Sequence, residues 1–180
     1  MAERTLVAGI GNIFLGDDGF GSAVVDALVQ PDAPSLPPGV RVVDYGIRGM
    51  HLAYDLLDGW DRLVLVDALP DRGDPGRLAV LRIAAEDLST AVIDAHGMDP
   101  GATLSALGPL GGTLPPTVLV GVQVADVQER MGLSPAVAAA VPAAVAAVQD
   151  LILGWPSAGA PSAGAPSVAA PGSASTWKVA

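Results

Sequence analysis

The stretch GIGNIFLGDDGFG, from Gly9 to Gly21, decides how the N-terminal half of the chain is expected to fold. It begins inside a short apolar run over residues 5–10, which predicts a buried strand, and ends where apolar residues start to recur at helical spacing. A glycine-rich turn between a strand and a helix usually holds phosphate. Two neighbouring carboxylates, Asp17 and Asp18, would repel that ligand. The turn is therefore expected to hold something else.

A dinucleotide-binding turn is the interpretation to test first, because Gly9 and Gly11 follow a strand and Asp44 ends the next one. That fingerprint requires a third glycine three residues after Gly11, where this chain has Phe14. The aspartates of the turn would oppose a pyrophosphate, and no Walker lysine accompanies the glycines. These residues argue against nucleotide binding, which stays an alternative for the function.

Strand and helix patterns alternate along the chain up to about residue 155. Apolar runs predict strands, and apolar residues at intervals of three and four predict helices. The predicted strands cover residues 5–10, 40–45, 62–68, 78–83 and 117–122, and the predicted helices cover 19–29, 49–57, 99–107 and 135–153. Pro142 is expected to kink or split the last helix. This alternation predicts an α/β fold, a three-layer open sheet of about five mostly parallel strands with helices on both faces.

Composition changes at residue 156 and divides the chain into two parts. Residues 1–155 are expected to form a single α/β domain, which is long enough for a sizeable core. Residues 156–180 repeat the motif SAGAP and offer no apolar face to bury. They predict a disordered tail rich in alanine, proline, serine and glycine.

Charge and residue usage exclude several classes of function. The formal net charge of -10 argues against binding to nucleic acid or to an anionic membrane. The chain has no cysteine, which excludes disulfides, thiol nucleophiles and thiolate metal ligands. No stretch approaches the roughly 20 apolar residues of a membrane span, and the first residues do not resemble a secretory signal. We therefore expect a cytoplasmic protein that acts as a monomer.

Three side chains that follow strands are candidates for a functional site: Asp18 after the first strand, Asp67 at the end of the third and His96 after the fourth. Open α/β sheets bind ligands at the carboxyl ends of their strands, where the strand order reverses. If the order begins 2-1-3, Asp18 and Asp67 flank one crevice. Two carboxylates and an imidazole suit a divalent ion such as nickel, zinc or manganese. Alternatively, Asp67 pairs with an arginine such as Arg48 or Arg62, because a buried unpaired carboxylate is costly.

The other candidates also have structural interpretations. Asp17 or Asp18 can cap the helix that follows them, and we assign that role to Asp17. His96 can bond to the backbone of its own loop. His51, on the predicted helix over residues 49–57, is expected at the surface or partly packed.

Five motifs occur in the order seen in a known protein family. They are GIGNIFLGDDGFG, VVDYGIRG, LVLVDA, HGMDP and SPAVAAAVP, and they extend from about Leu6 to Leu153. In this set the chain resembles the maturation endopeptidases of [NiFe]-hydrogenases. The resemblance implies an enzyme that removes a short C-terminal extension from the hydrogenase large-subunit precursor after nickel insertion. The nickel would be supplied by this substrate protein and would not belong to the enzyme.

The resemblance also implies roles for individual residues. Family members are thought to recognise the substrate's nickel with an acid after the first strand, an aspartate ending a later strand and a histidine. These positions match Asp18, Asp67 and His96. Many members have glutamate at the first position, so the shorter Asp18 is expected to shift the fit to the metal without changing its chemistry. The turn GIRG after Asp44 departs from the Gly-Thr common in the family, which leaves the substrate contact of this loop open.

Metal-assisted hydrolysis is the mechanism that these residues suggest. No serine is evidently paired with His96, so a Ser–His–Asp arrangement is not expected. Nickel held by the substrate and by the three candidate residues would position the peptide bond for attack by water, with the base unassigned. A nickel-checking chaperone that docks without cutting is the alternative.

Overall fold

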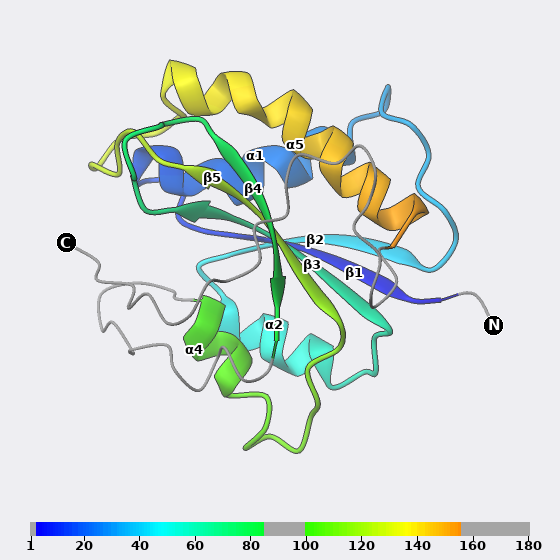
Figure 1. The fold of residues 1–180 in the computed structure, drawn as a ribbon. Helices are drawn as coiled ribbons and strands as arrows, with labels where there is room; N and C mark the ends of the chain where they lie inside the picture. Colours follow the sequence, from blue (N-terminus) through cyan, green and yellow to red (C-terminus); the bar gives the residue numbers. More distant parts are fainter. Residues whose placement is uncertain (1–2, 85–99, 156–180) are drawn as a thin grey trace.

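Five strands form one sheet in the order β2-β1-β3-β5-β4 (Figure 1). The computed structural model of the chain describes residues 3–84 and 100–155. The strands are β1 Thr5–Ile10, β2 Val40–Gly46, β3 Arg62–Leu69, β4 Leu78–Ile83 and β5 Thr117–Gln123. Strands β2, β1, β3 and β5 run parallel, and β4 is antiparallel to β5. The predicted sheet of about five mostly parallel strands is confirmed.

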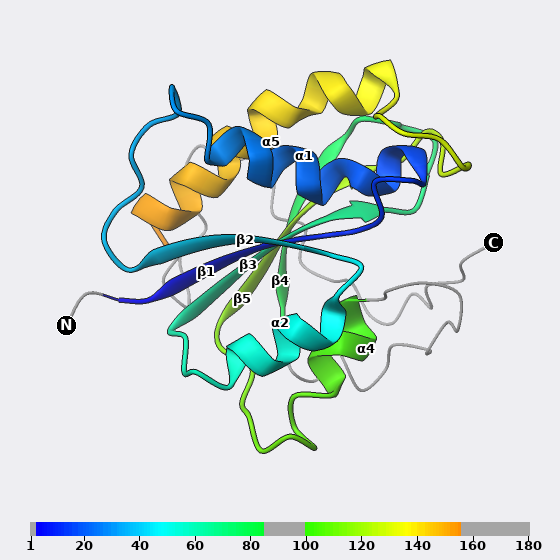
Figure 2. The same ribbon diagram turned by 180° about the vertical axis from the view of Figure 1, so that it is seen from behind.

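Helices cover both faces of the sheet, as Figures 1 and 2 show from opposite sides. One face carries α1 (Phe20–Leu28) and α5 (Pro135–Leu153), and the other carries α2 (Gly49–Leu56) and α4 (Pro100–Ser105). A short 3-10 helix, η1 (Gly16–Gly19), precedes α1. The three-layer α/β architecture is therefore confirmed, and the described elements lie close to their predicted bounds.

Two apolar cores join the sheet to its helices. Successive side chains of a strand point to opposite faces. In β3, Val64 and Val66 belong to the core that contains α1 and α5, whereas Leu63 and Leu65 belong to the core that contains α2 and α4. All four are buried. A central strand covered on both faces needs apolar residues at every position, which explains the continuous apolar run in the sequence.

The close packing of α1 on the sheet depends on glycines in GIGNIFLGDDGFG. A Cβ atom at Gly21 would overlap the carbonyl oxygen of Ile10, and one at Gly9 would lie 2.6 Å from the carbonyl oxygen of Gly21. The glycine that lets helix and strand approach is therefore Gly21, in the first turn of α1. The dinucleotide fingerprint would need it at position 14, where Phe14 is 60% exposed instead.

Helix α5 is continuous through Pro142, so the expected split is wrong, whereas the alternative of a kink stays a prediction. Proline lacks the N–H that would donate to the carbonyl group four residues earlier. That carbonyl group belongs to Ala138, an exposed residue, so water can satisfy it. The lost hydrogen bond is therefore tolerated at this surface.

Helix α5 also differs from the expectation that no stretch approaches the length of a membrane span. Of the helices that the structure describes, it alone is long and apolar enough to cross a membrane, with 19 residues and a mean hydropathy of 1.9. Its residues Val137, Ala144 and Val148 are buried and pack into the core that α1 shares. Length and composition do not separate a core helix from a span, and here the packing makes α5 part of the fold.

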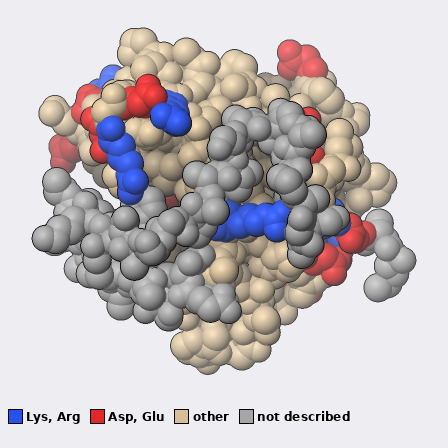
Figure 3. All heavy atoms as spheres, viewed as in Figure 1, with Lys and Arg blue, Asp and Glu red and all other residues tan. Residues whose placement is uncertain are grey.

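Charged side chains on the face shown in Figure 3 form small groups of mixed sign, not one continuous basic surface. Among the described residues of the whole domain, two ion pairs are Arg77 with Asp74, at 3.5 Å, and Arg130 with Asp126, at 3.1 Å. The predicted tail over residues 156–180 lies outside the described residues, so the division into domain and tail stays a prediction.

Candidate active site

The strand order reverses beside β1. The chain leaves β1 through α1 to β2 on one side, and leaves β2 through α2 to β3 on the other side of β1. The sheet therefore has the order 2-1-3 under which Asp18 and Asp67 were expected to flank one crevice. Parallel sheets bind ligands outside the carboxyl ends of the strands at such a reversal. The loop after β1 and the end of β3 therefore meet at the edge where a site is expected.

Asp18 lies in η1, after the sharp turn that leaves β1. The turn requires Gly11, because its φ is +128° and a Cβ atom there would overlap the carbonyl oxygen of Asp18. The Asp18 carboxylate is partly buried, and its Oδ2 accepts a hydrogen bond of 2.7 Å from the backbone N–H of Asn12. Burial raises the pKa of Asp18, and the Asn12 hydrogen bond opposes that rise only in part. A neighbouring cation would stabilise this carboxylate.

Asp17 does not cap α1, which corrects our assignment. Neither η1 nor α1 has a side-chain cap. The buried Asp17 carboxylate accepts hydrogen bonds from the backbone N–H groups of Ala125, Asp126 and Ser134, at 2.8, 3.0 and 2.6 Å, and from the Ser134 hydroxyl, at 2.9 Å. Burial by itself would raise the pKa of Asp17, but these hydrogen bonds outweigh burial and hold it below its usual value. Asp17 is therefore a structural anion.

The segment over residues 125–134 is fastened to the loop after β1 by these bonds. Ser134 caps α5 as predicted, since its Oγ accepts from the backbone N–H of Val137 while its hydroxyl donates to Asp17. The backbone N–H of Arg130 also donates to the carbonyl oxygen of Phe14, at 2.9 Å. Sequence reasoning missed this contact. The one sequence feature that indicated a further role for Asp17 was the pair of neighbouring aspartates, because a single helix cap needs only one carboxylate.

An apolar rim borders the joined loops. A shallow pocket there is lined by Asn12, Phe14, Leu15, Glu129, Arg130 and Met131. Phe14 is 60% exposed and Met131 is 70% exposed. Asn12 both lines this pocket and donates to Asp18, so the rim lies next to the candidate carboxylate. Large apolar side chains held at the surface by a fixed backbone are typical of protein contact sites.

Asp67 is buried near the carboxyl end of β3. Its Oδ1 accepts a hydrogen bond of 2.8 Å from the backbone N–H of Ala68. The two arginines considered as partners have other contacts. Arg62 pairs with Glu3, and Arg48 donates to two backbone carbonyl groups. Because β1 and β3 are neighbours in the sheet, Asp67 near the end of β3 and the Asp18 loop after β1 belong to adjacent strands.

His96, the third candidate, lies outside the described residues. Within residues 3–84 and 100–155, no group of three His, Cys, Asp or Glu side chains is arranged to hold a metal ion. The joint site of Asp18, Asp67 and His96 therefore stays a prediction.

Asp44, the acid that a dinucleotide ribose would need, is already engaged. Its Oδ1 accepts hydrogen bonds from the Ser22 hydroxyl, at 3.0 Å, and from the backbone N–H of Gly46, at 2.9 Å. These bonds stabilise the turn after β2. The geometry agrees with the sequence in arguing against a nucleotide.

Comparison with known proteins identifies the family. The family model described as hydrogenase maturation protease matches residues 24–151. The chain belongs to this family. It is 35% identical over 144 residues to the hydrogenase 2 maturation protease of Escherichia coli, a match that covers 79% of this chain and 86% of that protein.

Solved structures of hydrogenase maturation proteases have the same fold. The hydrogenase maturating endopeptidase HybD from E. coli superposes with a TM-score of 0.69 at 34% identity, over 81% of this chain and 89% of that one. A hydrogenase 2 maturation peptidase from a Thaumarchaeota archaeon gives a TM-score of 0.63 at 35% identity, over 83% and 98%. The resemblance expected from the five motifs is confirmed. As a member of the family the chain is an endopeptidase, which disfavours a chaperone that never cuts.

Proposed function

We propose that this protease removes the C-terminal extension of a [NiFe]-hydrogenase large-subunit precursor once nickel has been inserted. The nickel is cargo of the precursor, and Asp18, Asp67 and His96 contact it. The observation that carries the proposal is the state of Asp18. It is a partly buried carboxylate at the reversal of strand order, and Asn12 is its hydrogen-bond donor.

The donor chemistry supports a borderline divalent ion. Carboxylate oxygens and an imidazole nitrogen suit nickel. The chain has no cysteine, so any thiolate ligands of the metal come from the precursor. Because the metal arrives with the substrate, the protease would recognise only a precursor that already holds nickel. A precursor without nickel lacks the positive charge that Asp18 and Asp67 would bind.

The surroundings of Asp18 support a protein substrate. Phe14 and Met131 present apolar surface beside the carboxylate, and the hydrogen bonds of Asp17 fix the loops that carry them. A small ligand would not need this exposed rim. A folded precursor can cover it and bring its C-terminal segment to the carboxyl edge of the sheet.

Catalysis requires a water molecule to attack the peptide bond. Bound nickel would fix the segment beside Asp18 and polarise the groups around it. Asp18 and Asp67 are two carboxylates that can accept the proton of the attacking water. Burial raises the pKa of Asp18, which makes its carboxylate more basic and so favours it as a proton acceptor.

A processing assay tests the proposal. The protease is incubated with the large-subunit precursor of its own organism, either loaded with nickel or free of it, and the products are weighed by mass spectrometry. We expect loss of the C-terminal segment from the loaded precursor alone. Equal cleavage of both forms would remove nickel from the mechanism, and intact precursor in both would contradict the assigned substrate.

A further inference from the structure

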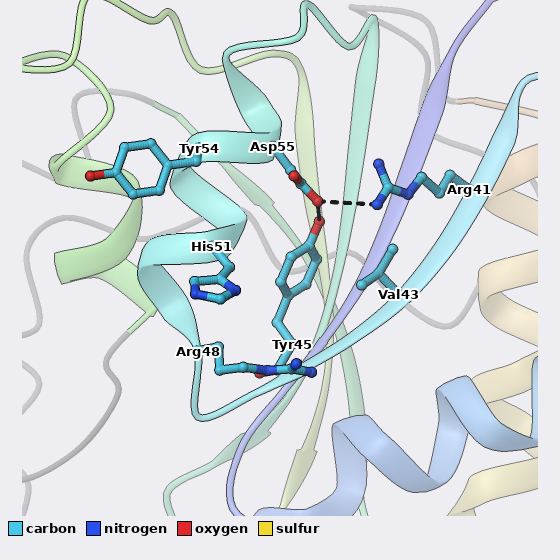
Figure 4. A pocket seen from close by; sticks show the side chains of 7 residues that line it. All are labelled: Arg41, Val43, Tyr45, Arg48, His51, Tyr54 and Asp55. Atoms are coloured by element: carbon cyan, nitrogen blue, oxygen red, sulfur yellow. Dashed lines mark hydrogen bonds and ion pairs between the residues drawn. The ribbon is translucent and has the colours of Figure 1, made fainter.

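A second pocket lies between α2 and β2, on the side of the sheet away from α1 (Figure 4). It is lined from β2, from the turn after it and from α2, by Arg41, Val43, Tyr45, Arg48, His51, Tyr54 and Asp55. Strand β2 is an edge strand of the sheet and pairs with β1 on one side only. No other strand of the described chain covers this pocket.

The pocket has an excess of positive charge, although the whole chain carries a net charge of -10. Arg41 pairs with Asp55 at 3.4 Å. Asp55 also accepts a hydrogen bond of 2.6 Å from the hydroxyl of Tyr45, so one carboxylate serves both groups. Arg48 has no carboxylate partner among the described residues. Its charge is left for a ligand.

Arg48 is also held in a fixed orientation. Its Nε donates to the carbonyl oxygen of Tyr45 at 3.1 Å, and its Nη2 donates to the carbonyl oxygen of Asp44 at 2.7 Å. A guanidinium group has five N–H donors, so others are left over. A fixed, planar guanidinium suits a carboxylate, which it can bind with two parallel hydrogen bonds.

The Arg48 end of the pocket is connected to the loop that carries Asp18. The backbone N–H of Gly11 donates to the carbonyl oxygen of Gly46 at 3.2 Å, and Gly46 is the last residue of β2, just before the turn that leads to Arg48. Gly11 in turn lies against the backbone of Asp18. An extended chain bound at the Asp18 edge can therefore continue along the end of β2 into the pocket.

We propose that this pocket binds a carboxylate of the precursor, either an acidic side chain or the terminal carboxylate of the segment that is removed, through the guanidinium of Arg48. The identity of the partner rests on the proposed function. Val43 supplies apolar surface for the stem of the bound residue, and Arg41 adds attraction at the far end. The site selects by charge and is separate from the bond that is cut.

Peptide titrations followed by amide NMR test the binding. The full chain is titrated with an extended pentapeptide carrying a central glutamate, with its glutamine counterpart, each with a free or an amidated terminus, and with inorganic phosphate. We expect peptides with a carboxylate to shift the amides of residues 41–55, and the amidated glutamine peptide to leave them unchanged. Comparing the two carboxylate positions tells which source is bound.

Variants of the arginines assign the contact. Arg48→Gln should weaken binding at least fivefold, and Arg48→Lys, which keeps the charge but not the fork, should fall between. Arg77→Gln, an exposed arginine paired with Asp74, is the matched control and should bind like wild type. If Arg48→Gln melts at a lower temperature than wild type, Arg41→Gln is used in its place. Without Arg41 the carboxylate of Asp55 loses its cationic partner and should repel the peptide carboxylate, so binding should weaken.

Kinetics separate this inference from the proposed function. Arg48→Gln should raise the KM for the precursor and leave kcat unchanged. Unaltered peptide affinity in Arg48→Gln, or preferential binding of phosphate, would overturn the proposed carboxylate site. Cleavage of the precursor by wild type would still support the proposed function in that case. Peptide binding that depends on Arg48, in a protein that cleaves no precursor, would uphold the pocket and contradict the function.

Discussion

Asp17 accepts two hydrogen bonds from Ser134, one from its backbone N–H at 2.6 Å and one from its hydroxyl at 2.9 Å, across 117 residues of sequence. This contact joins the loop after the first strand to the beginning of α5. It also shows that the two adjacent aspartates have different roles. The carboxylate of Asp17 is fully used in hydrogen bonds that hold the fold together. The carboxylate of Asp18 accepts one backbone hydrogen bond, from Asn12, and its partly buried surroundings favour a neighbouring cation.

Asp17→Asn should destabilise the protein by about 2–4 kcal/mol, because an amide cannot accept all of these hydrogen bonds and places N–H groups against N–H groups. Asp18→Asn should leave the protein at least as stable as wild type at neutral pH, because burial opposes the charge of Asp18 and the amide oxygen can still accept from Asn12. Urea unfolding of the two variants measures this. Similar losses in both would contradict the division of roles.

The same pair predicts opposite responses to acid. The pKa of Asp17 is lowered in the fold, so its stabilisation is complete above the unfolded value near 3.8 and is lost as pH falls through the folded pKa. The pKa of Asp18 is raised, so its contribution is most favourable below 3.8 and declines as pH rises through the folded pKa. The deficit of Asp17→Asn should therefore shrink in acid. Unfolding curves at pH 7 and pH 3 (about one unit below the unfolded value) check this.

Processing activity should depend on the charge and reach of Asp18. Asp18→Asn should abolish cleavage of nickel-loaded precursor, because a neutral amide is a poor ligand for a divalent ion. Asp18→Glu should retain substantial activity, since it keeps the carboxylate. Asp67→Asn and His96→Ala should also lose cleavage, with circular dichroism confirming that each is folded. Wild-type activity in Asp18→Asn would take Asp18 out of the proposed site.

Gly21→Ala should destabilise the fold by about 1–3 kcal/mol, because the added methyl group would overlap the backbone of Ile10 where α1 crosses β1. Gly108→Ala is the control, since nothing lies within 4 Å of a Cβ atom there. Thermal melting of both variants gives the comparison. A Gly21→Ala protein that melts with the control would mean that the helix shifts without cost.

A chain that ends after Trp155 should keep its melting temperature and its processing activity. The composition of residues 156–180 does not offset the entropy of ordering them. Trp155 is retained because its ring lies 5.4 Å from the guanidinium of Arg62. A fall in either quantity would show that the tail docks on the domain or recruits the precursor.

The alternation of strands and helices could be predicted from the sequence, and so could the positions of Asp18 after the first strand and Asp67 near the end of the third. The order 2-1-3 entered only as a condition, which the structure meets. The predicted features follow from local periodicity or from the rules of parallel sheets, which act over short spans of chain. Ser134 as the cap of α5 is equally local, because a cap and its helix are neighbours in sequence.

Only the tertiary structure decided the role of Asp17, the glycine that brings α1 to the sheet and the direction of β4. From the sequence, Asp17 was expected to cap the helix that follows it. Its actual partners lie more than a hundred residues away, where no local pattern indicates them. The close approach at Gly21 depends on how α1 crosses β1. Strand β4 runs antiparallel because residues 70–77 are too few for a parallel crossover, which needs about a dozen or more. Local pattern determines which elements form, whereas long-range packing determines which polar groups those elements use up and which are left for chemistry.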